Sequence, residues 1–195
     1  MHHLLGQAPK KWGRAGEPNH EDTSLLPRES QMIDPRYLNI LREIYIRLVD
    51  RPICWVVTGS LGMALQGMEI EIHDIDIQTD KQGAYEFESL FAEYVVEPVR
   101  YLASERIRSY LGTFEIDGIK VEIMGDIQKM SPGQEWEPPV KVEQYRQWIR
   151  YNDMRVPVLS LEYEYQAYLK LGRTEKAETI RRWLVERDAP KKGAG

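Results

Sequence analysis

Residues 55–79 of this 195-residue chain read WVVTGSLGMALQGMEIEIHDIDIQT: an apolar run, a Gly-Ser turn and an Asp-x-Asp strand. Side chains alternate along a strand, so Asp74 and Asp76 point to the same face. Asp is depleted in strands and two like charges on one face repel each other, so stability does not explain this pair. A divalent cation held between the two carboxylates does explain it. The stretch therefore favours metal-dependent phosphoryl or nucleotidyl transfer.

The orientation of a third carboxylate depends on the dipeptide Asp117-Gly118. This dipeptide lies between two alternating runs and predicts a two-residue hairpin. This turn places Ile116 opposite Ile119 and Thr113 opposite Glu122. One face of the hairpin is then apolar, and it consists of Phe114, Ile116, Ile119, Val121 and Ile123. The other face is polar and carries Glu122. We therefore expect Glu122 to share the open face of a sheet with the two aspartates, while helices cover the apolar face.

The rest of the chain divides into one domain and two tails. Residues 1–33 are rich in Gly, Pro, His and charge, and we expect a disordered tail there. A single domain is expected at 34–187, with a C-terminal helical segment from about residue 160, and a flexible tail at 188–195. Helices are expected at 35–49, 61–66, 84–94, 161–171 and 174–187, and strands at 53–58, 72–79, 119–123 and 155–159. The amphipathic stretch 142–151 fits either a helix or a strand.

Composition limits the classes of function. The net charge of −5 provides no general basic field for duplex nucleic acid, although it leaves room for a local basic patch. The single cysteine, Cys54, lies in an apolar run, which predicts a buried and unreactive thiol and excludes an internal disulfide. No apolar stretch reaches the ~18 residues of a membrane helix. Together with the lack of a secretory signal, this predicts a cytoplasmic protein without membrane contact.

Each of these signals is weak when it is considered alone. Gly59-Ser60 at a strand-to-helix junction can present N–H groups and a hydroxyl to a phosphate, but Gly-Ser usually only makes a turn. Asp74 and Asp76 alone also fit a solvated edge strand, and Glu122 alone fits a surface pair with Lys120. The order, the spacing and the shared face must all coincide by chance if none of them is functional. Their conjunction favours a catalytic site.

The same residues resemble the DNA polymerase β-like nucleotidyltransferase superfamily over positions 55–125. From 33 to about 187 the chain is similar to small stand-alone predicted nucleotidyltransferases of bacteria. The stretches that carry this likeness are WVVTGSLGMALQG, HDIDIQTD, DGIKVEIMGDI and PVLSLEYEYQAYLKLGR. The resemblance implies an α+β nucleotidyltransferase fold, a small mixed β-sheet with helices on one face, followed by C-terminal helices. One departure is Glu122, which stands where the superfamily often has Asp.

The resemblance also implies an activity: transfer of a nucleoside monophosphate from an NTP to a hydroxyl acceptor, with release of pyrophosphate. Asp74 and Asp76 would be catalytic and would bind Mg²⁺, with Mn²⁺ as the alternative ion. Glu122 would complete the metal site and help deprotonate the acceptor, either as a ligand or from an outer position. Gly59 and Ser60 would hold the β- and γ-phosphates. ATP is the default donor.

Weaker candidates lie nearby in the sequence. Three basic residues could reach the triphosphate, although a solvated helix face is also a good description of them: Lys170, Arg173 and Lys176. Three tyrosines fit base stacking, although the helical core is the better explanation for at least the last two: Tyr163, Tyr165 and Tyr168. His73 points away from Asp74 by alternation, and we expect it to orient or pack.

The identity of the acceptor stays open at this stage. Little chain follows the sheet, so a protein or tRNA acceptor is considered beside a small molecule, and a homodimer could build the pocket between subunits. The alternative function is a non-catalytic nucleotide-binding module, or a toxin/antitoxin-type interaction module, on the same fold. Binding of NTP without turnover would favour the former, and a stable complex with a second chain the latter.

Overall fold

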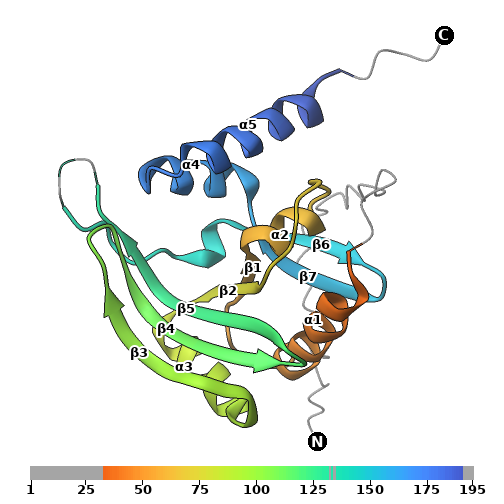
Figure 1. Ribbon diagram of the computed structural model, residues 1–195, viewed down its shortest axis with the longest axis vertical. Coiled ribbons are helices and arrows are strands. Elements are labelled where there is room, and N and C mark those ends of the chain that lie inside the picture. The colour runs from red at the N-terminus through yellow and green to blue at the C-terminus, as the bar shows by residue number, and fades with distance from the viewer. Residues whose placement is uncertain (1–32, 132, 134, 191–195) are drawn as a thin grey trace, which may run out of the picture.

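The computed structural model describes residues 33–131, 133 and 135–190 (Figure 1). The expected tails therefore lie almost entirely outside the described residues, except that Ile33 is buried in the core and 188–190 are described. The elements follow one another as α1 (Pro35–Leu48), β1 (Val56–Thr58), α2 (Gly59–Leu65), β2 (Ile75–Thr79), α3 (Lys81–Leu90), η1 (Ala92–Tyr94), β3 (Val95–Ala103), β4 (Ile107–Ile116), β5 (Ile119–Lys129), η2 (Val142–Gln144), β6 (Arg146–Tyr151), β7 (Met154–Leu159), α4 (Leu161–Lys170) and α5 (Thr174–Asp188).

The strands form one mixed sheet in the order β3-β4-β5-β2-β1-β7-β6. Strand β2 runs parallel to β5, β1 runs parallel to β7, and the other neighbours are antiparallel. The predicted α+β class with a mixed sheet is thus confirmed. The sheet has seven strands, which is more than the sequence predicted. Strand β3 was not predicted, and the ambiguous stretch 142–151 forms η2 and the edge strand β6.

The hairpin between β4 and β5 has the predicted register. Ile116 pairs with Ile119 and Thr113 pairs with Glu122 across the two strands. The turn residue Asp117 has φ 48° and Gly118 has φ 74°. Two consecutive positive φ angles are what a two-residue hairpin turn requires, and Asp and Gly tolerate them. The turn chemistry therefore fixes which side chains of β5 face the core and which face outward.

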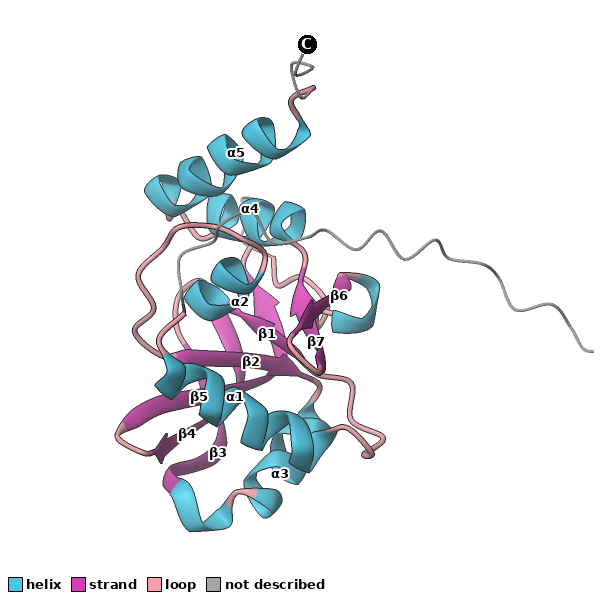
Figure 2. Ribbon diagram, turned by 90° about the vertical axis from the view of Figure 1, so that its right-hand side faces the viewer, coloured by secondary structure: helices cyan, strands magenta, loops and turns pink. Residues whose placement is uncertain are grey.

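Helices α1 and α3 cover one face of the sheet, and the main core lies beneath them (Figure 2). Helix α1 begins as predicted, with the Asp34 side chain accepting a hydrogen bond from the Arg36 amide and Pro35 in the first turn. The largest buried side chains are aromatic. Phe87 stacks on Phe91 with ring centroids 4.3 Å apart and meets Phe114 edge-on at 5.1 Å. These contacts anchor α3 to the hairpin.

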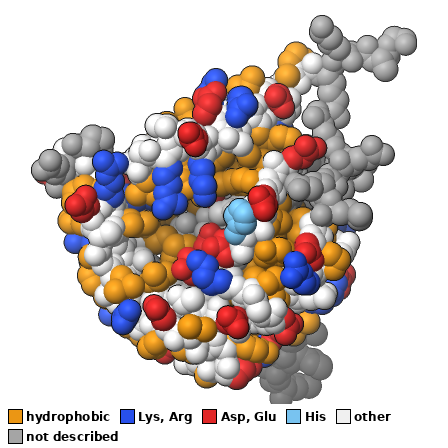
Figure 3. All heavy atoms as spheres, in the orientation of Figure 1, with side chains coloured by type: hydrophobic (Ala, Val, Ile, Leu, Met, Phe, Trp, Pro, Cys, Tyr) orange, Lys and Arg blue, Asp and Glu red, His pale blue; other side chains and the backbone are white. Residues whose placement is uncertain are grey.

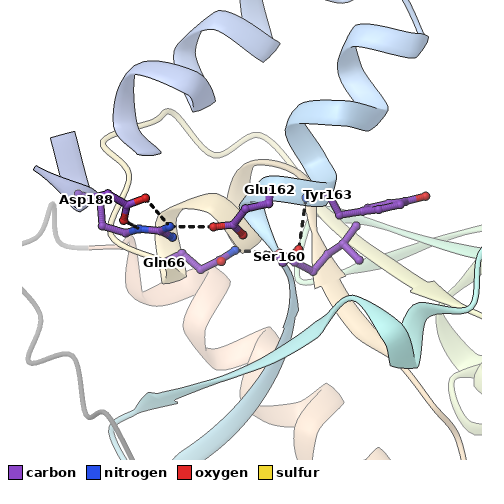
Figure 4. Close-up of polar contacts among 7 residues, drawn as sticks. Gln66, Ser160, Glu162, Tyr163 and Asp188 are labelled. Carbon is purple, nitrogen blue, oxygen red and sulfur yellow. Dashed lines mark hydrogen bonds and ion pairs between the residues drawn. The ribbon is translucent and has the colours of Figure 1, made fainter. Parts of the chain in front are cut away.

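The C-terminal helices form a second cluster with α2, apart from the first helical layer. Figure 4 shows the polar contacts on this side: the Ser160 hydroxyl caps α4, and the Gln66 amide reaches the Leu159 carbonyl. The Arg187 guanidinium of α5 lies between Glu162 at 2.7 Å and Asp188 at 2.8 Å. These contacts hold both helices against the end of the sheet.

The buried stripe of α4 differs from the prediction. The apolar spacing over 161–169 predicts a buried stripe of Leu161, Tyr165, Tyr168 and Leu169, yet Leu169 is 41% exposed. The buried positions are Leu161, Glu164, Ala167 and Tyr168. The buried face is shifted by about one position, and it includes Glu164, which accepts hydrogen bonds from Thr58 and Gly59. No helix in the described part of the chain is long and apolar enough to cross a membrane.

Candidate active site

Three carboxylates converge on the open face of the sheet, as the alternation predicted. Asp74, Asp76 and Glu122 each offer an oxygen, and these oxygens lie within 4.8 Å of one another. Asp76 of β2 pairs directly with Glu122 of the parallel strand β5, while Asp74 lies just before β2. Figure 3 shows acidic side chains gathered in a hollow of the surface, with Lys and Arg side chains along its upper rim.

The cluster carries more negative charge than its surroundings neutralise. Burial, and then the charges of Asp74 and Glu122, raise the pKa of Asp76 to about 7. Lys120 opposes this effect, because its ammonium lies 3.2 Å from Asp74 Oδ2 and 3.3 Å from Glu122 Oε1. The surface pair between Lys120 and Glu122 is therefore also present, as a bridge across the cluster. An all-oxygen set with excess negative charge suits Mg²⁺ or Mn²⁺.

The Gly-Ser turn lies directly against this cluster. Gly59 opens α2 with φ +64°, and a Cβ at this position would collide with the carboxylate of Asp76. Thr58, the last residue of β1, pairs with Asp76 across the antiparallel strands. Only glycine fits both the backbone angle and the space. The structure thus brings the turn and the second aspartate of the Asp-x-Asp strand together.

Glu164 of α4 also belongs to this site, and the sequence did not single it out. It is only 4% exposed, and it accepts hydrogen bonds from the Thr58 hydroxyl and, at 3.0 Å, from the Gly59 amide. Burial raises the pKa of Glu164, while the two hydrogen bonds and then the charges of two nearby lysines lower it, Lys129 and Lys176. The Gly59 amide, expected to bind phosphate, therefore has a carboxylate partner within the chain. The only available signal was that residue 164 lies three positions after the buried Leu161.

We expect Glu164→Leu to lower the free energy of unfolding by about 2–5 kcal/mol, because it leaves two buried donors without an acceptor. Glu164→Gln retains a side-chain oxygen and should recover most of the loss. The matched control is Glu162→Leu, two positions earlier on the same helix. The Glu162 carboxylate is exposed and pairs with Arg187. It should change stability by less than about 1 kcal/mol. Urea unfolding measures all three, and equal losses for the two Leu variants would contradict the expectation.

The basic residues of the C-terminal helices have mixed placements. Lys170 pairs with Glu137 at 2.6 Å, so its charge is already partnered. Arg173 precedes α5, is exposed, and lies 6.0 Å from the ring centre of Tyr168. The pKa of Tyr168 is raised by burial and by the charges of Glu164 and Asp76, and Arg173 opposes this shift. Tyr168 is thus close enough to feel the charges of the carboxylates and of Arg173. Triphosphate binding by Lys170 and Arg173 stays a prediction.

The remaining candidates are placed as follows. The Tyr163 hydroxyl accepts a hydrogen bond from Lys129 at 2.8 Å, and its ring stacks on Tyr145 at 4.1 Å. Lys129, which the sequence did not single out, is buried, and burial lowers its pKa to about 8. His73 is 69% exposed, so a packing role is wrong. Cys54 is half-buried rather than fully buried, and burial raises the pKa of its thiol.

A mixed sheet with a Gly-Ser turn, an Asp-x-Asp pair and a third carboxylate on the neighbouring strand defines a nucleotidyltransferase domain. The sequence model of the aminoglycoside-2''-adenylyltransferase family matches residues 40–181, and the chain belongs to this family. A comparison with curated proteins found no match. The predicted class of enzyme and the resemblance to nucleotidyltransferases are thereby confirmed.

Solved structures agree with this assignment. A candidate nucleotidyltransferase from Thermotoga maritima is 58% identical, with a TM-score of 0.71 over 80% of this chain and 96% of that chain. The lincosamide antibiotic adenylyltransferase LnuA, solved with lincomycin, is 14% identical, with a TM-score of 0.50 over 77% and 98% of the two chains. The antibiotic-resistance factor ANT(2'')-Ia is 14% identical, with a TM-score of 0.53 over 76% and 83%. The last two similarities concern the fold.

Proposed function

We propose that this protein transfers AMP from ATP to a hydroxyl group of a small-molecule acceptor and releases pyrophosphate. The observation that carries the proposal is the convergence of Asp74, Asp76 and Glu122 within 4.8 Å on the open face of the sheet. The family supports adenylyl transfer. A small acceptor is supported by LnuA, solved with lincomycin, and by ANT(2'')-Ia, which has also been solved with adenylyl-2''-tobramycin. We further propose that residues 34–187 act as one cytoplasmic domain.

In the proposed reaction, the acceptor oxygen attacks the α-phosphorus of ATP and the bond to the β-phosphate oxygen breaks. Asp74 and Asp76 would hold the divalent cation, and Glu122 would accept the proton of the acceptor hydroxyl. Mg²⁺ or Mn²⁺ would supply the positive charge that the triphosphate and the three carboxylates lack. Lys120 must release Asp74 and Glu122 when the cation and the nucleotide are bound. Ser60 and the basic residues Lys170 and Arg173 would bind the leaving pyrophosphate.

A thermal-shift titration with each of the four NTPs, with and without Mg²⁺, tests the donor. A ligand at ~100 times its dissociation constant stabilises the fold by about 2.7 kcal/mol, which such a titration resolves. We expect a Mg²⁺-dependent shift with ATP in the wild type and none in Asp76→Asn. A shift with every NTP but no pyrophosphate release across aminoglycoside and lincosamide acceptors would instead favour a non-catalytic nucleotide-binding module.

A further inference from the structure

A second cavity lies away from the carboxylates, where the end of α1 and the residues before β1 meet β6 and β7. Its volume is about 320 Å³. Three arginines contribute to its walls, Arg51, Arg146 and Arg155, and the remaining lining residues are aromatic or aliphatic, so the lining has a formal charge of +3. It shares no residue with the acidic cluster. A concentration of positive charge in a chain with a net charge of −5 needs a separate explanation.

Two of these guanidinium groups are ordered against one ring. Arg146 Cζ lies 4.8 Å and Arg155 Cζ lies 4.7 Å from the ring centre of Trp148. Stacking of this kind uses the faces of the guanidinium groups and leaves N–H edges available for hydrogen bonds. One N–H of Arg146 contacts the Cys54 sulfur at 3.5 Å, which is a weak acceptor. Trp148 therefore contacts the guanidinium groups of both Arg146 and Arg155.

None of the three arginines has a carboxylate partner among the described residues. Of the other eleven described arginines, six pair with a carboxylate, for example Arg42 with Asp153 and Arg187 with Glu162. Three unpaired guanidinium groups beside one cavity repel one another, and a bound anion relieves that repulsion. Arginine is also the side chain best suited to bidentate recognition of phosphate oxygens.

We propose that this cavity is a second ligand site, separate from the catalytic centre, that binds phosphate groups through Arg51, Arg146 and Arg155. A cavity of this size holds a small phosphorylated molecule, such as pyrophosphate or a mononucleotide, or one or two phosphates of a single-stranded RNA. Both sources present the same oxyanion chemistry. The inference does not depend on nucleotidyl transfer, because none of its residues belongs to the proposed catalytic site.

Binding is measured in the presence of EDTA, which removes divalent cations from the acidic cluster. The probes are inorganic pyrophosphate, followed by calorimetry, and a fluorescent ten-nucleotide single-stranded RNA, followed by anisotropy. The pocket variant is Arg51→Gln/Arg155→Gln, in which both altered side chains are exposed. The matched control removes the same charge at distant exposed positions, Arg100→Gln/Arg182→Gln. Thermal melting verifies that both double variants fold, and Asp76→Asn reports any binding at the catalytic site.

We expect the pocket variant to lose at least tenfold in affinity, while the control and Asp76→Asn stay within twofold of the wild type. Loss of pyrophosphate binding identifies a free phosphorylated ligand. Loss of RNA binding alone identifies a phosphodiester strand. Equal affinity of the pocket variant and the control, or no binding of either probe to the wild type, overturns the proposal. A change in affinity confined to Asp76→Asn also overturns it, because the phosphate would then bind beside the carboxylate site.

Discussion

Asp76→Asn is expected to reduce nucleotidyl transfer by a factor on the order of 10³ or more while the fold is retained. Asp76 is the carboxylate that both the Gly-Ser turn and the strand of Glu122 contact, so it is central to any cation bound in the cluster. Asn keeps the size and shape of the side chain but removes its charge and one acceptor oxygen. Pyrophosphate release at saturating ATP and Mg²⁺ measures the loss.

The control for this variant is Asp117→Asn in the hairpin turn, which makes the same chemical change at φ 48°, an angle that Asn also tolerates. It should leave the rate within about twofold of the wild type. If Asp76→Asn retained wild-type turnover, the assignment of the acidic cluster as the catalytic site would be wrong.

The same substitution should increase stability at neutral and alkaline pH when no divalent cation is present. The pKa of Asp76 is about 7 in the fold against 3.8 as its ordinary value, so folding opposes its ionisation. Both states are mostly protonated below about pH 3, the penalty grows as the pH rises towards 7, and above that it reaches roughly 4 kcal/mol. Asp76→Asn removes the penalty. We therefore expect a higher melting temperature than the wild type at pH 8, and almost no difference at about pH 3.

Gly59→Ala is the second substitution with a large expected effect. The added methyl group would overlap the carboxylate of Asp76, and φ +64° is unfavourable for alanine. We expect a loss of about 2–5 kcal/mol in the free energy of unfolding, because strain at a positive φ adds to overpacking. Displacement of Asp76 should also lower transfer about 100-fold.

Gly118→Ala separates these two effects. Gly118 has φ +74°, and a Cβ added there meets nothing within 4 Å. This variant therefore suffers the backbone strain without a collision and should lose only about 1 kcal/mol, with unchanged transfer. Urea unfolding and pyrophosphate release on both variants provide the comparison. Equal stability and equal activity for the two would show that the turn does not press against the aspartate.

The parts of the site that were predictable depend on local patterns. The Asp117-Gly118 turn fixes the register of β4 against β5, and strand alternation then places Glu122 beside Asp76 without any knowledge of the rest of the fold. Glu164 could not be found in this way. It meets Thr58 from 106 positions away, and an acid in the first turn of a helix is ordinarily a solvated partner of the helix dipole.

The strands show the same distinction. β3 went unnoticed because it is an edge strand whose side chains are mostly exposed, so its sequence carries little of the alternation that burial imposes. Leu169 was assigned to the buried stripe of α4 because it is apolar, whereas the structure buries Glu164 instead. Apolar periodicity cannot reveal a face that is selected by hydrogen bonds.

The position of Glu164 also determines how much of the chain must be synthesised before the Gly-Ser turn has its carboxylate partner. Thr58 and Gly59 lie in the first third of the chain, but their carboxylate partner is on α4, and β1 lies in the sheet between β2 and the late strand β7. All three acidic residues of the cluster are translated before either α4 or β7. A nascent chain ending before α4 therefore contains the three carboxylates of the cluster but lacks Glu164, the hydrogen-bond partner of the turn. Because these contacts span about a hundred residues, the turn acquires its partners only after β7 and α4 have emerged from the ribosome.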